Sequence, residues 1–197
     1  MFISENSFFS LALLRADEAD AEAFALRGDP LHTTNLSLAG RQAAGALFLR
    51  YYQARFQGGA PDVPAVDFIK KGKPVLPDFP DFHYSISHSG EWAAAASSGL
   101  GPIGVDIQKI SRFDARVMKK CFAADDIALL EEAEETEKDA LFTRLWTEYE
   151  AVLKVFGGGL LSLSKDTYAD ARDNVTLFHP DAPEGYALCV AIGMPQT

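Results

Sequence analysis

Residues 138–156 read KDALFTRLWTEYEAVLKVF, and the glycines Gly157-Gly-Gly159 follow them directly. Apolar side chains recur in this stretch every three or four residues and gather on one broad helical face, made of Leu141, Leu145, Trp146, Tyr149, Val152, Leu153 and Phe156. A run of glycines is a strong signal for the end of a helix. The stretch therefore predicts a long helix that buries one face and stops at the glycines.

The order of elements around this helix predicts two similar halves. A second long helix is expected over residues 40–56, and shorter helices over 111–120 and 124–135. Alternating or apolar stretches predict strands at 1–14, 66–69, 74–76, 83–88, 92–97, 103–107, 161–164, 174–179 and 186–192. The fold class is therefore α+β, a pseudo-twofold arrangement of two similar halves, each a long helix packed on a small, mostly antiparallel sheet. The turn at residues 99–102 divides the chain into an N-terminal half, 1–101, and a C-terminal half, 102–197.

The composition is that of an ordinary globular protein. Of the 197 residues, 48% are hydrophobic and 23% are charged, which fits one large or two small domains. The formal net charge of −10 argues against nucleic-acid binding. We expect no membrane segment, because no stretch approaches the roughly 18 apolar residues of a span. Cys121 and Cys189 match no zinc or redox spacing, so we expect buried free thiols in a reducing cytoplasm.

One candidate for chemistry is the predicted strand Gly104-Val-Asp-Ile-Gln108. Asp106 and Gln108 lie two residues apart, so on a strand both side chains point to the same face. Two oxygen donors on one face supply half of a site for a hard cation such as magnesium. The competing interpretation is a solvent-facing polar pair on an edge strand.

A second candidate lies within the long predicted helix. Glu150 and Lys154 are four residues apart and share one helical face. A carboxylate beside an ammonium can hold a metal and a phosphate together. The competing interpretation is a surface ion pair worth about 0.3–0.5 kcal/mol.

A third candidate is Tyr84-Ser-Ile-Ser-His-Ser-Gly90, with Gly72-Lys-Pro74 upstream. His88, between two serines at the end of a strand, can donate hydrogen bonds to a phosphate. A histidine in a turn with a purely structural role is the alternative.

Together these pieces resemble the Sfp-type 4′-phosphopantetheinyl transferases. That family has a Gly-Lys-Pro turn, an Ile-Ser-His-Ser strand end, a G-[IV]-D-[IV]-E strand and a W-[ST]-x-K-E-A-x-x-K-x-x-G-x-G helix. The matching stretches here are Gly72-Lys-Pro74, Ile86-Ser-His-Ser89, Gly104-Val-Asp-Ile-Gln108 and the helix motif that runs from Trp146 to Gly159. Each motif alone is a weak signal, whereas all of them in this order, within residues 40–161, are specific.

The resemblance implies an enzyme that transfers 4′-phosphopantetheine from coenzyme A to a serine of an acyl or peptidyl carrier protein. Magnesium would be its cofactor and adenosine 3′,5′-bisphosphate its second product. It would be a cytoplasmic monomer with coenzyme A between its halves. The N-terminal half would hold the nucleotide side, and the C-terminal half would hold the metal.

The resemblance also assigns roles to the residues of the C-terminal half. Asp106, Gln108 and Glu150 would bind the magnesium ion. Asp106, Glu150 and Lys154 would be catalytic, with Glu150 or a metal-bound water as the base. Lys154 would contact the pyrophosphate or the phosphate on the pantetheine side.

Four further residues would bind coenzyme A in the N-terminal half. Ser87 and His88 would hold phosphates of its nucleotide part. Lys73 would lie beside the adenosine. Arg41 matches a basic residue that meets the phosphate end of coenzyme A in relatives.

The sequence departs from the family pattern at three places. Tyr149 replaces a lysine, so a charged contact to phosphate or substrate is absent. Gln108 replaces a glutamate, and its uncharged amide should bind magnesium more weakly. Residues 15–28 are acidic where relatives carry lysines, and Arg27 and Arg41 would compensate in part.

The carrier partner implied by the resemblance is an acidic helical domain. A basic stripe, which we define as Arg112, Arg116, Lys119 and Lys120, falls on the helix predicted after the metal strand. We expect this stripe to receive the carrier, although it could equally be a solvated helix face. Fatty-acid, polyketide and peptide-synthetase carriers all fit.

Two other functions remain open. The first is a catalytically impaired relative that keeps coenzyme A or carrier binding, which Gln108 and Tyr149 favour and the retained Asp106, Glu150 and Lys154 disfavour. The second is an unrelated metal-dependent nucleotide enzyme with convergent spacings, which should lack the two-halved plan.

Overall fold

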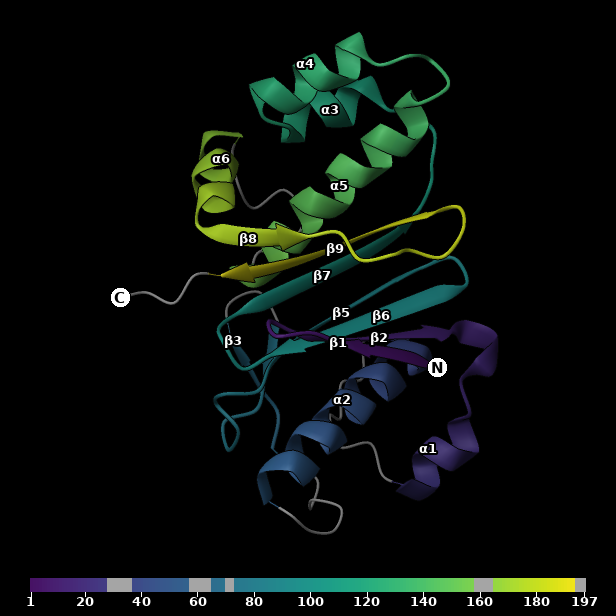
Figure 1. Ribbon diagram of the computed structural model, residues 1–197, viewed down its shortest axis with the longest axis vertical. Helices are drawn as coiled ribbons and strands as arrows, with labels where there is room; N and C mark the ends of the chain where they lie inside the picture. The colour runs from purple at the N-terminus through teal and green to yellow at the C-terminus, as the bar shows by residue number, and fades with distance from the viewer. Residues whose placement is uncertain (28–36, 57–64, 70–72, 158–164, 194–197) are drawn as a thin grey trace.

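The computed structural model describes residues 1–27, 37–56, 65–69, 73–157 and 165–193 (Figure 1). The strands are β1 Phe2–Glu5, β2 Ser10–Arg15, β3 Asp67–Ile69, β4 Lys73–Val75, β5 His83–Ser89, β6 Trp92–Ser98, β7 Ile103–Lys109, β8 Val175–Phe178 and β9 Tyr186–Gly193. The helices are α1 Ala21–Arg27, α2 Leu38–Phe56, α3 Ala115–Cys121, α4 Ala124–Glu132, α5 Lys138–Val155 and α6 Lys165–Asp173, and a short 3-10 helix spans Ala16–Glu18.

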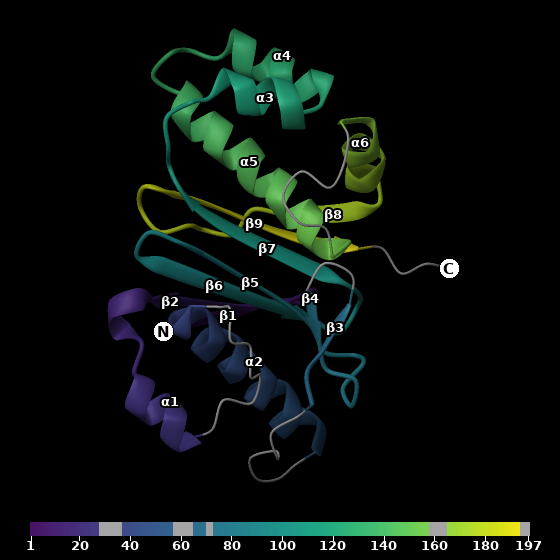
Figure 2. The same cartoon turned by 180° about the vertical axis from the view of Figure 1, so that it is seen from behind.

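Two antiparallel sheets lie between the two long helices. The first has the strand order β1-β2-β6-β5 and the second β7-β9-β8, while β3 and β4 form a separate ribbon. Helix α2 covers the outer face of the first sheet and α5 that of the second (Figures 1 and 2). The predicted α+β class, with one long helix on a small antiparallel sheet in each half, is confirmed. A twofold relation between the halves stays a prediction.

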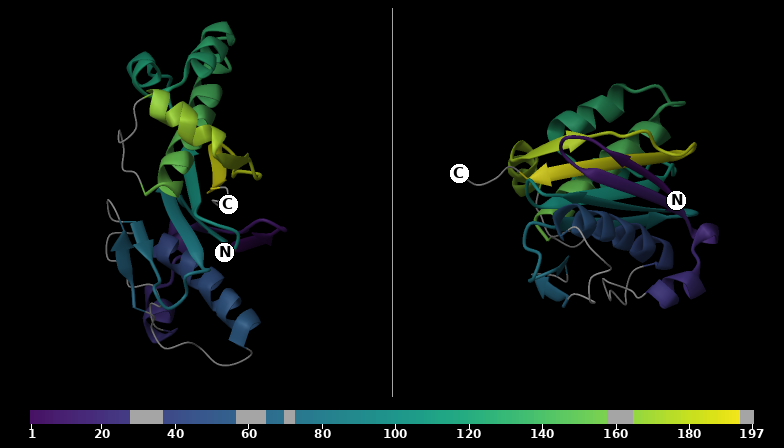
Figure 3. Two further views of the ribbon diagram at one scale, coloured as in Figure 1. Left: turned by 90° about the vertical axis from the view of Figure 1, so that its left-hand side faces the viewer. Right: turned by 60° about the horizontal axis from the view of Figure 1, so that its bottom comes forward.

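Apolar side chains on the inner faces of the two sheets share one core. They are Phe9, Leu11, Leu13, Ala94 and Ala96 from the first half and Ile103, Val105, Ile107, Leu188, Val190 and Ile192 from the second. Since residues of a strand alternate between faces, the intervening residues of β7 face α5 instead. Figure 3 shows the result from two further directions, with the strands between α2 and α5.

Two element predictions were wrong, each because a side chain caps the backbone. The predicted strand at 1–14 is divided into β1 and β2, because Asn6 Oδ1 accepts hydrogen bonds from the backbone N–H groups of Phe8 and Phe9. The helix predicted over 111–120 begins only at Ala115, because Asp114 is its N-cap and accepts from the N–H of Arg116. The strand predicted at 161–164 lies outside the described residues.

The C-terminal half has its own core beneath α5. Both free cysteines belong to it and are buried, as predicted. Tyr149 is also part of it, and its ring packs against those of Trp146 and Tyr168.

Among the described helices, none is both long and apolar enough to cross a membrane.

Serine side chains join the two sheets along β5 and β7. Ser85 Oγ accepts from the N–H of Val105 at 3.1 Å, and Ser89 Oγ accepts from the N–H of Lys109 at 3.0 Å. Between them, Ser87 Oγ donates to Asp106 Oδ1 at 2.6 Å. These serines alternate along β5, so one face of that strand supplies all three contacts. We call this set, Ser85, Ser87 and Ser89, the serine seam.

Gly104 allows α5 to lie directly against β7. A Cβ atom at this position would stand 2.0 Å from the carbonyl oxygen of Ala151 and 3.0 Å from the backbone nitrogen of Val155. Both neighbours are helix backbone, so neither can rotate away as a side chain would. The glycine of the Gly104–Gln108 stretch is therefore required by helix packing.

We predict that Gly104→Ala will lower the free energy of unfolding by about 3 kcal/mol, because overpacking against backbone forces α5 away from β7. Urea denaturation measures the change. Gly99→Ala is the matched control, since a Cβ there would come no closer than 3.9 Å to another atom. Equal stability of the two variants would show that the close contact is not needed.

Candidate active site

Asp106 is the centre of a buried polar cluster between β7 and α5. Its side chain is almost inaccessible, and Oδ1 accepts from Ser87 Oγ at 2.6 Å and from Lys154 Nζ at 2.7 Å. Lys154 Nζ also donates to the carbonyl oxygen of Val105 at 2.9 Å. The other carboxylate oxygen, Oδ2, is buried and has no hydrogen-bond partner among the residues that the structure describes. One oxygen of Asp106 is thus held in place while the other is available to a ligand.

Glu150 adds a second buried carboxylate, one helical turn before Lys154. Its Oε1 is buried and, like Oδ2 of Asp106, makes no hydrogen bond within the described part of the chain. Burial, together with the negative charge of Asp106, raises the pKa of Glu150 to about 7, although the nearby Lys154 acts in the opposite direction. Two carboxylates thus share a single ammonium, and the site carries an excess of negative charge when both are ionised.

This arrangement fits a hard cation. Buried acceptor oxygens without a partner are costly, and a divalent cation would satisfy both of them at once. Gln108 follows Asp106 by two residues on β7 and is half-buried, so strand geometry puts its amide on the same face. Across the described ranges, no group of three His, Cys, Asp or Glu side chains could hold a metal. The oxygens available to a cation at this point are therefore those of Asp106 and Glu150, with Gln108 on the same face of β7 as Asp106.

Ser87 and His88 lie on opposite faces of β5. Ser87 is buried, and its hydroxyl proton goes to Asp106, so in this structure it orients a carboxylate. His88 is exposed and shares its face with Ile86, which packs with α2. The structure thus brings Ser87 to the carboxylates and directs His88 toward α2.

Lys73 ties the N-terminal half to the last turn of α5. Its Nζ donates to the carbonyl oxygens of Ile103 at 2.9 Å, Lys154 at 2.7 Å and Val155 at 3.4 Å. Burial lowers the pKa of Lys73 to about 8. It lies near His83, whose pKa it helps to lower, whereas His88 is at the other end of β5. The structure therefore does not place the ammonium of Lys73 together with His88.

Arg41 lies on α2, in the N-terminal half. Its guanidinium carbon is 5.7 Å from the centre of the Phe24 ring. Like His88, it belongs to the α2 side of the first sheet and not to the carboxylate cluster. The predicted residues thus fall into three sets: the carboxylate cluster with Gln108, Lys154 and Ser87; Arg41 and His88 near α2; and Lys73 at the end of α5.

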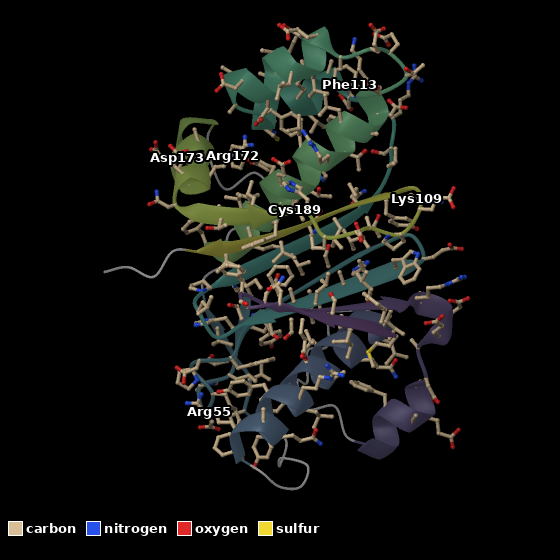
Figure 4. The ribbon with its side chains drawn as sticks, viewed as in Figure 1. Arg55, Lys109, Phe113, Arg172, Asp173 and Cys189 are labelled. Carbon is tan, nitrogen blue, oxygen red and sulfur yellow. The ribbon has the colours of Figure 1, made fainter. Side chains whose placement is uncertain are left out.

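The sequence did not reveal a second buried charge network on the far side of α5. Arg172 reaches from α6 toward α5 (Figure 4) and binds both carboxylate oxygens of Asp126, at 2.8 and 3.1 Å, and Glu148 Oε2 at 3.1 Å. His179 Nε2 lies 3.0 Å from the other oxygen of Glu148. Neighbours in sequence therefore serve different sites, with Glu148 docking α6 while Glu150 faces Asp106. Helical spacing puts Glu148 and Glu150 on different faces of α5, but no local pattern shows that Glu148 meets Arg172 from α6.

Tyr149, the departure at the lysine position of the helix motif, points away from Asp106. Its side chain is 1% exposed and lies in the C-terminal core. Burial raises its pKa to about 12, so the phenol stays neutral. The tyrosine is explained by core packing.

We predict that Glu150→Gln will make the metal-free protein more stable at alkaline pH. The pKa of Glu150 is about 7 in the folded chain against the ordinary 4.5, so its stabilising contribution is complete below pH 4.5 and is lost as the pH rises to 7. The variant should match the wild type near pH 4.5 and exceed it by about 2–3 kcal/mol at pH 8.

Urea denaturation in a chelator between pH 4.5 and 8 tests this. The exposed Glu131 on α4 provides the control, Glu131→Gln. A stability difference that does not change with pH would contradict a raised pKa at Glu150.

Comparison with known proteins finds a family match in the C-terminal half. Residues 102–189 match the model of the 4′-phosphopantetheinyl transferase superfamily. The chain is 37% identical over 118 residues to the 4′-phosphopantetheinyl transferase Sfp of Bacillus subtilis strain 168, covering 60% of this chain and 52% of that protein. It is 36% identical over 112 residues to the transferase psf-1 of Bacillus pumilus, covering 56% of this chain and 48% of the relative.

A longer match is less similar. The 4′-phosphopantetheinyl transferase gsp of Aneurinibacillus migulanus is 28% identical over 168 residues, which are 77% of this chain and 68% of that protein. The match to Sfp and psf-1 therefore spans about half the length of each relative.

Proposed function

We propose that the chain is an Sfp-type 4′-phosphopantetheinyl transferase, which transfers the phosphopantetheine group of coenzyme A to a serine of a carrier protein, because its C-terminal half matches that superfamily and its similar relatives are such transferases. The second product would be adenosine 3′,5′-bisphosphate. The observation that carries this proposal is the pair of buried carboxylates, Asp106 and Glu150, each with an unpartnered oxygen beside Lys154.

The proposed reaction joins the serine oxygen to the phosphorus on the pantetheine side and breaks its bond to the bridging oxygen of the pyrophosphate. Asp106, Gln108 and Glu150 would hold a magnesium ion, which when bound neutralises charge on the pyrophosphate. Lys154 would add its positive charge there. Because little covalent chemistry falls to the protein, positioning and charge account for most of the catalysis.

Glu150 is the proposed acceptor of the serine proton. In the absence of a bound cation, a pKa of about 7 lets the carboxyl group of Glu150 exist in both protonation states near neutral pH. Asp106, with one oxygen held by Ser87 and Lys154, cannot turn to take this role without losing both contacts.

The coenzyme A nucleotide would lie on the N-terminal half. His88 and Arg41, both on the α2 side of the first sheet, are the proposed phosphate contacts. Lys73 would lie beside the adenosine, with its ammonium engaged by the last turn of α5. The sequence predicts Ser87 at a phosphate of coenzyme A. Its hydrogen bond to Asp106 favours a different role, in which Ser87 orients Asp106 as a metal ligand.

The second candidate is a catalytically impaired relative that binds coenzyme A or a carrier. Gln108 favours it, because an amide in place of a carboxylate weakens the attraction for a divalent cation. Tyr149 no longer favours it, since this side chain fills the core.

The proposed activity is tested by mixing the protein with coenzyme A, magnesium and a panel of apo carrier proteins, then recording intact carrier masses. We expect one carrier to gain a single phosphopantetheine unit, and the gain should disappear with chelator and with Asp106→Ala. The exposed Asp125→Ala is the control. Binding of coenzyme A without any mass gain would support the impaired relative, and the absence of both would refute the proposal.

The carrier is proposed to dock on α3 and the residues before it. All members of the basic stripe are exposed, with Arg112 in the loop before α3 and Lys119 and Lys120 in its last turn. Arg116 has its charge partly balanced by Asp114 at 3.1 Å. The glutamate-rich stretch 131–137, which covers the end of α4 and the residues after it, lies nearby in sequence and should repel an acidic partner, which limits how that partner can approach.

We predict that the double reversal Arg116→Glu and Lys120→Glu will lower kcat/KM for the carrier at least tenfold at low salt and leave the affinity for coenzyme A unchanged. Arg55→Glu is a matched control, because Arg55 is also exposed and paired with an aspartate, Asp81. Carrier kinetics and coenzyme A titration calorimetry give the two readouts. If carrier use survives the reversal, the carrier docks elsewhere.

The chain is further proposed to act as a monomer in the cytoplasm. Its two cysteines are buried free thiols, which supports a reducing compartment. Each long helix covers its own sheet within one chain, which supports a site that needs no second copy.

A further inference from the structure

The C-terminal half holds the turn that follows His88. This turn, Gly90–Glu91, connects β5 to β6 in the N-terminal half. The hydroxyl of Tyr186, at the start of β9, accepts a hydrogen bond from the N–H of Glu91 at 3.1 Å. On the other side of the turn, Ser89 Oγ accepts from the N–H of Lys109. The backbone is therefore fixed from outside at both ends of the turn.

The fit at this turn is close. Gly90 has φ 54°, and a Cβ there would stand 2.5 Å from the Tyr186 hydroxyl oxygen. The phenol thus occupies the space that any larger residue at position 90 would need. A positive φ also favours glycine at this position. Gly90 and Tyr186 are therefore matched to each other across the two halves.

Tyr186 itself is held in place by strand pairing and by core packing. In the register of β7 and β9 it lies opposite Lys109, which Figure 4 labels at the end of β7. The N–H of Ile110 donates to the carbonyl of Gly185 at 2.8 Å, which closes the ladder beside it. Its half-buried ring packs against the core shared by the two sheets. The hydroxyl therefore projects from a rigid strand end.

The exposed ring of His88 depends on its backbone for its position. Within the part of the chain that the structure describes, no side chain holds that ring by a hydrogen bond. His88 is one residue before Ser89 and three before Glu91, the two residues that the C-terminal half holds. If the turn became more mobile, the position of the His88 ring would therefore change with it.

We infer that Tyr186 is a positioning residue for coenzyme A, acting through His88. It fixes the β5–β6 turn so that the imidazole is presented to a phosphate of the nucleotide part. This inference rests on the proposed function. Asp106 and Lys154 are held by contacts of their own, and none of these involves Tyr186, so Tyr186 affects substrate binding and not the chemical step.

The test compares Tyr186→Phe, His88→Ala and the double variant. We expect Tyr186→Phe to raise the KM and the calorimetric Kd for coenzyme A about fivefold, as the loss of one ordinary hydrogen bond would, with kcat within twofold. In the His88→Ala background the same change should have no further effect. Tyr52→Phe on α2, a half-buried tyrosine within the aromatic cluster of the N-terminal half, is the control.

The outcomes separate this inference from the proposed function. If the wild type binds coenzyme A and Tyr186→Phe binds it equally well, the positioning role is wrong. It is also wrong if Tyr186→Phe weakens the wild type and His88→Ala by the same factor, because the tyrosine would then act independently of the histidine. If the wild type itself neither binds nor uses coenzyme A, the proposed function fails, and the role assigned to Tyr186 fails with it.

Discussion

The contact of α5 with the bare backbone of Gly104 sets the spacing of the whole candidate site. With no side chain between them, the turn of α5 at Ala151 lies directly on β7. Glu150 and Lys154, on either side of that turn, are thereby brought to Asp106, two residues along the strand. A larger residue at position 104 would separate the helix from the strand and, with them, the carboxylates from the lysine. The absence of a side chain at Gly104 therefore accounts both for the close packing of α5 on β7 and for the short distances between the charged groups.

The end of α5 gathers positive charge for a general reason. The last carbonyl groups of a helix lack partners within it and carry partial negative charge. Lys73 satisfies two of them, those of Lys154 and Val155, from the other half of the chain. Lys154 itself turns to β7 and to Asp106. Lys73 thus stabilises the end of α5, while the ammonium of Lys154 takes part in the carboxylate cluster at Asp106.

Much of this architecture could be predicted from local sequence patterns. The helix α5 was expected over 138–156 from its apolar spacing and ends at Val155, and the face shared by Asp106 and Gln108 follows from strand alternation alone. Caps were harder to predict, because Asn6 and Asp114 act through single hydrogen bonds that override a longer pattern.

Contacts between distant segments could not be predicted. The partner of Ser87 and the three carbonyls around Lys73 come from strands and helices far apart in sequence, and no spacing encodes them. The burial of Tyr149 belongs to the same class, because its neighbours Tyr168 and Cys121 are brought to it only by the tertiary fold. A motif gave the residue types of the site, while the fold decided which of them meet.

The serine seam has a mechanical consequence. A backbone ladder fixes two strands in one register, since sliding by a single residue breaks every bond. A serine hydroxyl can rotate about its Cα–Cβ bond and follow a partner that moves by a fraction of an ångström. Between β5 and β7 the contacts are therefore made by serine side chains, whereas within each sheet they are backbone ladders. A small shift between the halves could therefore be followed by the serine hydroxyls without a change of strand register, and Asp106 and His88 stand on the two strands that meet there.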